Sequence, residues 1–247
     1  MLVARGHHVL LHGRNPAKLE RVEAALSNLA DGGRVESHVA DLSRLADVEA
    51  LAVDVTARHA KLDVLINNAG VFKTPDPVTG DGLDIRFVVN TIAPYLLTQR
   101  LLPLIGPSGR VVNLSSAAQS PVNLEALAGQ VRLSDMEAYA QSKLALTIWS
   151  AEMAKAHKSG PVIVAINPGS LLASKMVKEG FGVEGGDLRI GADILIRAAL
   201  SDEFETATGQ YFDNDKGRFA APHAEARDTW KAEAVMQAIK TVLADMT

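Results

Sequence analysis

The sequence predicts an α/β protein with a Rossmann-like, doubly wound parallel sheet and helices on both faces. Short β-branched or aliphatic runs alternate along the chain with longer segments of helical period, which is typical of βαβ units. The run from Leu62 to Ile66 is rich in aliphatic residues, which suits an interior parallel strand. The 247 residues contain no repeat and no long linker, so residues 1–247 are expected to form one domain.

The first predicted strand is His8 to His12, and a Gly-Arg-Asn-Pro turn follows it. In that turn Asn15 can cap a helix, and Pro16 can occupy the first helical turn, where its missing N–H costs little. Apolar residues then recur at helical spacing, which predicts a helix after the strand: Leu19, Val22, Leu26 and Leu29.

The remaining elements continue the same alternation. Further strands are predicted at 34–40, 62–66, 110–114, 161–166 and 209–212. Helices are predicted at 44–59, 82–102, 188–200 and 228–243, and another long helix begins with a capping box formed by Ser134 and Glu137. The glycine-rich segment 175–187 has little periodicity and is expected to be a mobile loop beside a ligand site.

Composition excludes several classes of partner. With 25 basic and 29 acidic side chains the net charge is −4, which favours neither nucleic acid nor an anionic membrane. No apolar run reaches the roughly 18 residues that a membrane span needs. The absence of cysteine excludes disulfides and thiolate chemistry and suits a reducing compartment, so a cytoplasmic location is expected. The histidines lack metal-ligand spacing, and no metal is expected.

Tyr139 and Lys143 are four residues apart on the long predicted helix, so their side chains share one face. A phenol has an ordinary pKa near 10 and is a poor acid or base at neutral pH, but a nearby ammonium group favours the phenolate. The pair therefore suits proton transfer. Alone, the same spacing also fits an ordinary surface tyrosine and lysine.

Further motifs occur in a fixed order around this pair: Asn67-Asn68-Ala69-Gly70, Asn90, Ser115-Ser116 and Pro168-Gly169. With Tyr139-Ala-Gln-Ser-Lys143, they make nearly the whole chain resemble the short-chain dehydrogenase/reductase family. Four segments resemble the retinol-dehydrogenase-like branch of that family: Asp81-Gly82-Leu83, Tyr95-Leu-Leu-Thr98, Ser142-Lys143-Leu144 and Gly209-Gln-Tyr-Phe212.

The resemblance implies an oxidoreductase that moves hydride between NADP(H) and a small-molecule carbonyl or alcohol substrate. By position, Ser116 would bind the substrate oxygen, and Tyr139 would be the general acid/base. Lys143 would lower the tyrosine pKa and hold the nicotinamide ribose, while Asn90 would organise a proton-relay water. Ser115 is the alternative serine, but it is better interpreted as a buried hydroxyl bonded to the backbone.

The resemblance also implies cofactor contacts at the ends of two strands. Asn68, Ala69 and Gly70 would form part of the cofactor wall, and Pro168 and Gly169 would lie along the nicotinamide.

Two further contacts would involve the adenosine half of the cofactor. Asp41 and Leu42 would meet the adenine, although Asp41 equally suits a helix N-cap. Arg14 follows the first predicted strand, where an arginine accommodates the 2′-phosphate, so NADP(H) is favoured over NAD(H). The alternative for Arg14 is a solvated arginine in a turn.

The family's opening strand and glycine-rich phosphate-binding turn are not found in this sequence. The expectation is therefore an N-terminally truncated Rossmann-like domain that lacks its first strand, either because this sequence starts too late or because the protein itself is shortened. The strands at 8–12 and 62–66 would each lose a neighbour, and their exposed edges would favour pairing with a second chain as a homo-oligomer. The alternative function is a non-catalytic protein of the same fold that binds a partner or a metabolite.

Overall fold

The computed structural model describes residues 1–29, 33–173 and 175–246, and the chain divides into two compact units, Met1–Arg58 and His59–Thr247. The fold class predicted from the sequence is confirmed, because parallel strands alternate with flanking helices. The interpretation of the chain as one domain stays a prediction.

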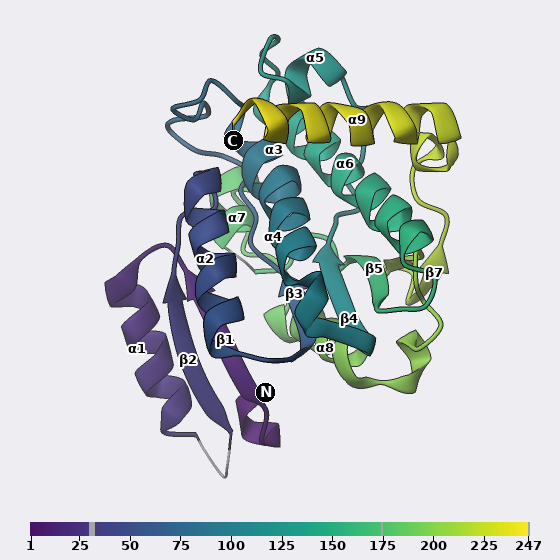
Figure 1. Cartoon of the computed structure of the whole chain (residues 1–247). Coiled ribbons are helices and arrows are strands. Elements are labelled where there is room, and N and C mark those ends of the chain that lie inside the picture. Colours follow the sequence, from purple (N-terminus) through teal and green to yellow (C-terminus); the bar gives the residue numbers. More distant parts are fainter. Residues whose placement is uncertain (30–32, 174, 247) are drawn as a thin grey trace. The chain divides into compact units, whose positions relative to one another are not determined.

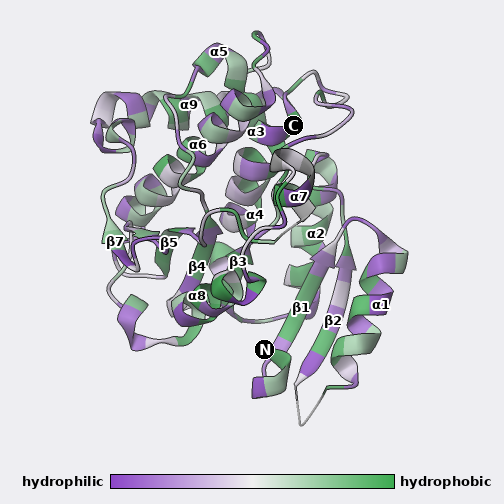
Figure 2. Cartoon of the chain, turned by 180° about the vertical axis from the view of Figure 1, so that it is seen from behind, coloured by the Kyte–Doolittle hydropathy of each residue, from purple (hydrophilic) through white to green (hydrophobic). Residues whose placement is uncertain are grey.

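The N-terminal unit is built on two parallel strands joined by a helix, and a second helix follows (Figure 1). Its elements are β1 (His8–Gly13), α1 (Pro16–Ser27), β2 (Arg34–Val39) and α2 (Leu45–Arg58). The Asn15 side chain accepts a hydrogen bond from the Lys18 N–H at 2.9 Å, so the predicted cap is confirmed. The hydrophobic middle of β1 is only half-buried (Figure 2).

The C-terminal unit contains a five-stranded sheet whose spatial order follows the chain order. Its strands are β3 (Leu62–Asn67), β4 (Ile105–Leu114), β5 (Val162–Asn167), β6 (Tyr211–Asp213) and β7 (Arg218–Ala220). The first four are parallel, and β7 pairs antiparallel with β6. The parallel strands present their carboxyl ends at one edge, which is where ligands bind in open α/β sheets.

Helices cover both faces of this sheet (Figures 1 and 2). The helices of this unit are α3 (Ile85–Phe87), α4 (Ala93–Leu101), α5 (Leu124–Leu127), α6 (Asp135–Ala156), α7 (Lys175–Phe181), α8 (Leu188–Leu200) and α9 (Thr229–Asp245). Helices α4 and α6 pack on one face, and α8 packs on the other. None of the helices in the described part of the chain is long and apolar enough to span a bilayer.

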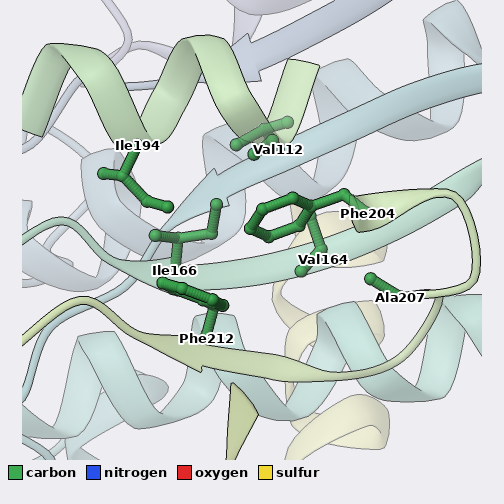
Figure 3. Packing of buried hydrophobic residues seen from close by; sticks show 8 residues of the cluster. Val112, Val164, Ile166, Ile194, Phe204, Ala207 and Phe212 are labelled. Atoms are coloured by element: carbon green, nitrogen blue, oxygen red, sulfur yellow. The ribbon is translucent and has the colours of Figure 1, made fainter. Parts of the chain in front are cut away.

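The core beneath α8 is formed by aliphatic and aromatic side chains from the strands, from α8 and from the segment between α8 and β6 (Figure 3). Its labelled members are Val112, Val164, Ile166, Ile194, Phe204, Ala207 and Phe212. The rings of Phe204 and Phe212 lie with their centroids 5.1 Å apart. Replacing either phenylalanine with alanine would cost about 3–5 kcal/mol, so this packing helps to hold β5 and β6 beside each other.

Strand β3 has the unpaired edge expected where the family's opening strand is missing, although its aliphatic run alone suited an interior strand. It pairs with β4 on one side and, among the described strands, forms the edge of the five-stranded sheet. Its aliphatic residues are half-buried and Asp63 is exposed, whereas β4 and β5 carry the buried residues. The exposed Asp63 fits this edge position, because a carboxylate is rarely buried without a partner.

The predicted continuous helix over 82–102 is wrong in detail. A π-helix at Val88–Ile92 separates α3 from α4. Pro94 has no backbone N–H, so the carbonyl of Asn90 lacks its α-helical donor at this point. Single π-turns inside helices are frequent at functional sites, and Asn90 lies in this one.

The segment 175–187, predicted as a loop, begins with helix α7 at residues 175–181. Its glycines conceal the helical period in the sequence. The mobility expected of this segment stays a prediction.

Candidate active site

Helix α6 carries Tyr139 and Lys143, and its N-terminus is closed by the predicted capping box. The Ser134 hydroxyl accepts from the Glu137 N–H, and the Glu137 carboxylate accepts from the Ser134 N–H. The predicted box is confirmed. It fixes where the helix begins and therefore which turn of the helix holds Tyr139.

A buried ion pair also holds the start of α6. The Arg86 guanidinium binds Asp84, the N-cap of its own helix α3, and pairs with Asp135 in the first turn of α6. Arg86 thus joins α6 to the segment that continues into the π-helix.

Ser116 and Tyr139 come together although they lie far apart in the sequence. A hydrogen bond joins their side chains, and both residues are half-buried. Ser116 follows β4, and its hydroxyl also accepts the backbone N–H of Ala118 at 3.1 Å. Two hydroxyl groups therefore meet at a point where a substrate oxygen could be bound and protonated.

Lys143 is buried beside this pair. Its Nζ lies 5.8 Å from the centre of the Tyr139 ring and donates to the Leu114 carbonyl at 2.7 Å. Within the described part of the chain, no carboxylate lies at ion-pair distance from this ammonium group. Lys143 has three N–H donors, so it retains capacity that a ribose hydroxyl could use.

Burial moves the two pKa values in opposite directions. Burial lowers the pKa of Lys143 to about 8. Burial also raises the pKa of Tyr139, and the hydrogen bond with Ser116 only partly opposes that increase. The expected lowering of the Tyr139 pKa by Lys143 is therefore not seen in the chain alone. At neutral pH the phenol keeps its proton, as a proton donor to a carbonyl must.

Ser115 is separate from this pair. Its hydroxyl is buried, lies 2.6 Å from the Thr147 hydroxyl and donates to the Lys143 carbonyl at 3.3 Å. The Ser115 N–H still bonds to a carbonyl of β5 at 2.8 Å, and consecutive residues of an extended chain point to opposite sides, which explains why only Ser116 reaches Tyr139. Ser115 is the buried, internally bonded hydroxyl that the sequence predicts.

Asn90 is completely buried within the π-helix. Its Oδ1 accepts from the Val71 N–H at 2.8 Å, while its Nδ2 donates to the Val71 carbonyl at 3.0 Å and to the Ser142 hydroxyl at 2.9 Å. The Ser142 hydroxyl in turn donates to the Tyr139 carbonyl at 2.7 Å. The Asn90 side chain therefore links the segment after β3 to the helix that carries Tyr139.

The segment after β3 approaches the same place. Asn68 and Ala69 are exposed, and Gly70 lies against the two polar side chains already described. A Cβ added to Gly70 would lie 3.4 Å from Asn90 Oδ1 and 3.5 Å from Lys143 Nζ. A glycine leaves this space open beside an ammonium group with spare donors, so the residues here fit a nicotinamide ribose.

The loop after β5 contains Pro168 and Gly169, both half-buried. Gly169 has a φ of +127°, a conformation that disfavours residues with a side chain. This loop and the segment after β3 both follow parallel strands of one sheet, so their contacts with a nicotinamide are compatible with the fold.

The three residues expected at the adenosine half belong to the N-terminal unit. Arg14 is exposed just after β1, and Leu42 is buried after β2. Burial raises the pKa of Asp41, but hydrogen bonds from Ser43 and the charges of Arg14 and Arg44 outweigh it, so the pKa is lowered. The Asp41 carboxylate accepts from both the N–H and the hydroxyl of Ser43, at 3.0 and 2.8 Å. Asp41 thus forms the turn before α2, and its adenine contact stays a prediction.

Phe72 is a site residue that the sequence does not reveal. It is buried, and its ring centroid lies 5.2 Å from that of Tyr139. A Cβ added to Gly180 of α7 would meet this ring at 2.5 Å, so only glycine permits that approach. Phe72 therefore stands between the predicted acid and helix α7. Its position shortly after Gly70 is the only signal in the sequence.

Known proteins of one family are similar to this chain. A model of the short chain dehydrogenase family matches residues 1–182. Retinol dehydrogenase 13 of Homo sapiens is 30% identical over 94% of this chain and 78% of its own length.

Two solved structures show the same fold. An uncharacterised protein from Mycobacterium paratuberculosis matches 98% of this chain and 85% of its own with a TM-score of 0.76 and 27% identity. A metagenomic short-chain oxidoreductase in complex with NADP matches 81% of this chain and 83% of its own, with a TM-score of 0.59 and 29% identity. The chain belongs to the short-chain dehydrogenase family of oxidoreductases.

Proposed function

We propose that this protein transfers hydride between NADP(H) and a moderately apolar carbonyl or alcohol, with Tyr139 as the general acid/base. One observation carries the proposal: the hydroxyls of Ser116 and Tyr139 are hydrogen-bonded next to a buried ammonium group, that of Lys143. The bound cofactor would supply the hydride.

In the reduction direction, the side chains hold the substrate oxygen and provide its proton. The Ser116 hydroxyl donates to that oxygen, and the Tyr139 hydroxyl protonates it as negative charge develops. The Lys143 ammonium stabilises the phenolate that remains on Tyr139 and holds the nicotinamide ribose.

Asn90 supports the same chemistry in two ways. Its side chain holds Val71 and Ser142, which keeps the segment before Phe72 and the backbone at Tyr139 in place. Its carbonyl lacks an α-helical donor because residue 94 is proline, which supports the water-organising role expected for Asn90.

The cofactor preference follows from Arg14. An exposed guanidinium after β1 suits a 2′-phosphate, and a related structure holds NADP. Replacing Arg14 with alanine is expected to weaken NADPH binding about 10- to 100-fold, since charge-assisted hydrogen bonds are lost, and to leave NADH binding unchanged. Fluorescence titration of the variant with each nucleotide measures the two affinities. An equal loss of affinity for NADPH and NADH would reject the assignment of Arg14.

The function is tested with Tyr139→Phe. The assay follows oxidation of NADPH with a panel of apolar aldehydes that includes all-trans-retinal, chosen because a relative is named retinol dehydrogenase. We expect the wild-type protein to reduce at least one aldehyde and the turnover rate of the variant to be about 10²- to 10⁴-fold lower. The matched control is Tyr95→Phe, which removes the hydroxyl of another buried tyrosine on α4. Turnover by Tyr139→Phe at the wild-type rate would refute the mechanism.

A folded wild-type chain that binds no NADPH would instead support the alternative of a non-catalytic binding protein. A cooperative thermal transition establishes that the chain is folded in that experiment. The cytoplasmic location expected from the sequence stays a prediction.

A further inference from the structure

Strand β6 contacts the loop that carries Ser116. The Tyr211 hydroxyl donates to the Ser116 carbonyl at 3.0 Å, and Tyr211 itself is buried. Its backbone is fixed between β5 and β7, where it pairs with Ala165 and Ala220. Gln119 gives the same Ser116 carbonyl a second donor at 3.0 Å. The orientation of Ser116 therefore depends partly on a residue 95 positions away.

The turn after β6 contacts the other active-site loop. Asn214 Nδ2 donates to the Pro168 carbonyl at 2.9 Å. The Asp215 carboxylate accepts from the Ser170 N–H at 2.8 Å and from the Ser170 hydroxyl at 2.5 Å. These bonds hold the loop on both sides of Gly169, which has no side chain of its own to fix its position.

We propose that the segment 211–215, the β6 clamp, positions both active-site loops. Its first residue orients Ser116, and its last two residues hold the loop 168–170. This inference rests on the proposed function for its kinetic consequences. The residues of the β6 clamp are positioning residues, because they act through the loops that they hold.

The two halves of the β6 clamp have different kinetic consequences. Ser116 would act on the reacting oxygen, so disturbing its backbone lowers kcat and leaves cofactor affinity unchanged. The loop 168–170 would contact the nicotinamide, so loosening it raises the KM for NADPH. A general loss of packing would instead lower thermal stability and move both constants together.

Tyr211→Phe tests the first half, because it removes one hydroxyl at almost constant volume. We expect kcat to fall about fivefold, the KM for NADPH to stay within about twofold, and Tm to change by no more than a few degrees. Gln119 keeps one donor on the Ser116 carbonyl, which limits the loss. Tyr95→Phe is the matched control and should leave kcat unchanged. An unchanged kcat in Tyr211→Phe, or an equal fall in both variants, would overturn this half.

Asp215→Ala tests the second half. We expect the KM for NADPH to rise about tenfold with little change in kcat, and Asp215→Asn to lie between wild type and alanine because its one oxygen replaces part of the carboxylate. Asp202→Ala is the control, since Asp202 is an exposed carboxylate away from both loops in sequence. An Asp215→Ala variant with the wild-type KM would contradict the assignment, as would an equal rise in Asp202→Ala.

Hydrogen–deuterium exchange separates this inference from the proposed function. Exchange should increase in residues 114–120 for Tyr211→Phe and in residues 167–172 for Asp215→Ala, each without an increase in the other loop. If the wild-type protein transfers no hydride, the proposed function fails, and the exchange pattern still decides whether the β6 clamp positions the loops. Unchanged exchange in both variants would refute the clamp.

Discussion

Two buried cations at helix α6 have opposite surroundings. Arg86 is 1% exposed, and its guanidinium bonds to the Asp84 carboxylate at 2.6 and 2.8 Å and pairs with Asp135. Burial lowers the Arg86 pKa, but the bonds and charges of the two aspartates outweigh it, so the pKa is raised. Lys143 is 3% exposed, donates to a backbone carbonyl rather than to a carboxylate, and has a pKa that burial lowers to about 8.

The difference separates a charge that holds the fold from the charge that we propose serves the chemistry. A buried ion pair neutralises its own charge and is costly to break. A buried ammonium group beside neutral partners is costly to keep, and groups of this kind are enriched at functional sites. The same contrast applies to Ser115, which is bonded internally, and Ser116, which faces Tyr139.

The largest effect is expected from breaking the Arg86 site. Arg86→Met leaves the buried Asp84 without its cation, so the free energy of unfolding should fall by about 3–5 kcal/mol. Urea denaturation measures this loss. Arg197→Met is the control, because the side chains of the Arg197–Glu203 pair are 45% and 38% exposed, and the change should cost no more than about 1 kcal/mol. Equal losses of unfolding free energy in the two variants would show that Arg86 has no special role in holding the fold.

The two serines provide the next test. Ser116→Ala should lower kcat about 10²- to 10³-fold, because it removes a donor to the developing oxyanion. Ser115→Ala should leave kcat within about threefold and lower the free energy of unfolding by about 1 kcal/mol, since only internal bonds are lost. Steady-state kinetics and urea denaturation of both variants check this. If Ser115→Ala lowered kcat more than Ser116→Ala did, Ser115 rather than Ser116 would be the serine that binds the substrate oxygen.

Removing the Lys143 charge should stabilise the protein while it abolishes the chemistry. Burial lowers the Lys143 pKa from 10.5 to about 8, so keeping the buried side chain charged at neutral pH costs the folded protein about 3 kcal/mol of stability. Replacing Lys143 removes this cost but also removes the hydrogen bond to the Leu114 carbonyl, which contributes about 1 kcal/mol. Lys143→Met should therefore raise the free energy of unfolding, measured in urea at pH 7, by about 2 kcal/mol. A destabilised Lys143→Met protein would mean that Lys143 holds the fold as Arg86 does.

The pH dependence gives the smallest effect per unit of pH, because the burial cost of Lys143 is recovered gradually. The folded pKa of Lys143 lies below its unfolded value, so between pH 8 and 10.5 the unfolded chain binds more protons and stability rises with pH. Below pH 8 both states are protonated and the full burial cost is present. Relative to Lys143→Met, wild-type stability in urea titrations should rise by up to about 1.4 kcal/mol per pH unit in this window. Parallel curves for the two proteins would show that Lys143 does not titrate there.

Local signals predicted much of the fold and the centre of the site. The capping box at Ser134 and Glu137 and the cap at Asn15 depend on neighbouring residues alone, and both are confirmed. The shared face of Tyr139 and Lys143 likewise needs only a helix. The pairing of Tyr139 with a serine at a strand end required the family resemblance, because no local rule brings such distant residues together.

Other features depend on tertiary contacts that a sequence pattern does not contain. Tyr211 reaches Ser116 across 95 positions, and nothing near Tyr211 in the sequence indicates that contact. Phe72 matters because Gly180 allows α7 to approach its ring. The break at 88–92 had a local cause in Pro94, which the helical period of the surrounding residues concealed.

Deuterium transfer decides whether Ser116, Tyr139 and Lys143 form a site for hydride transfer. NADPH carrying deuterium at the reactive C4 position is incubated with all-trans-retinal or another apolar aldehyde, and the alcohol product is analysed by mass spectrometry. The wild-type protein should place deuterium on the alcohol carbon, and Tyr139→Phe should do so about 10²- to 10⁴-fold more slowly. Deuterium transfer by Tyr139→Phe at the wild-type rate would contradict the assignment of the site.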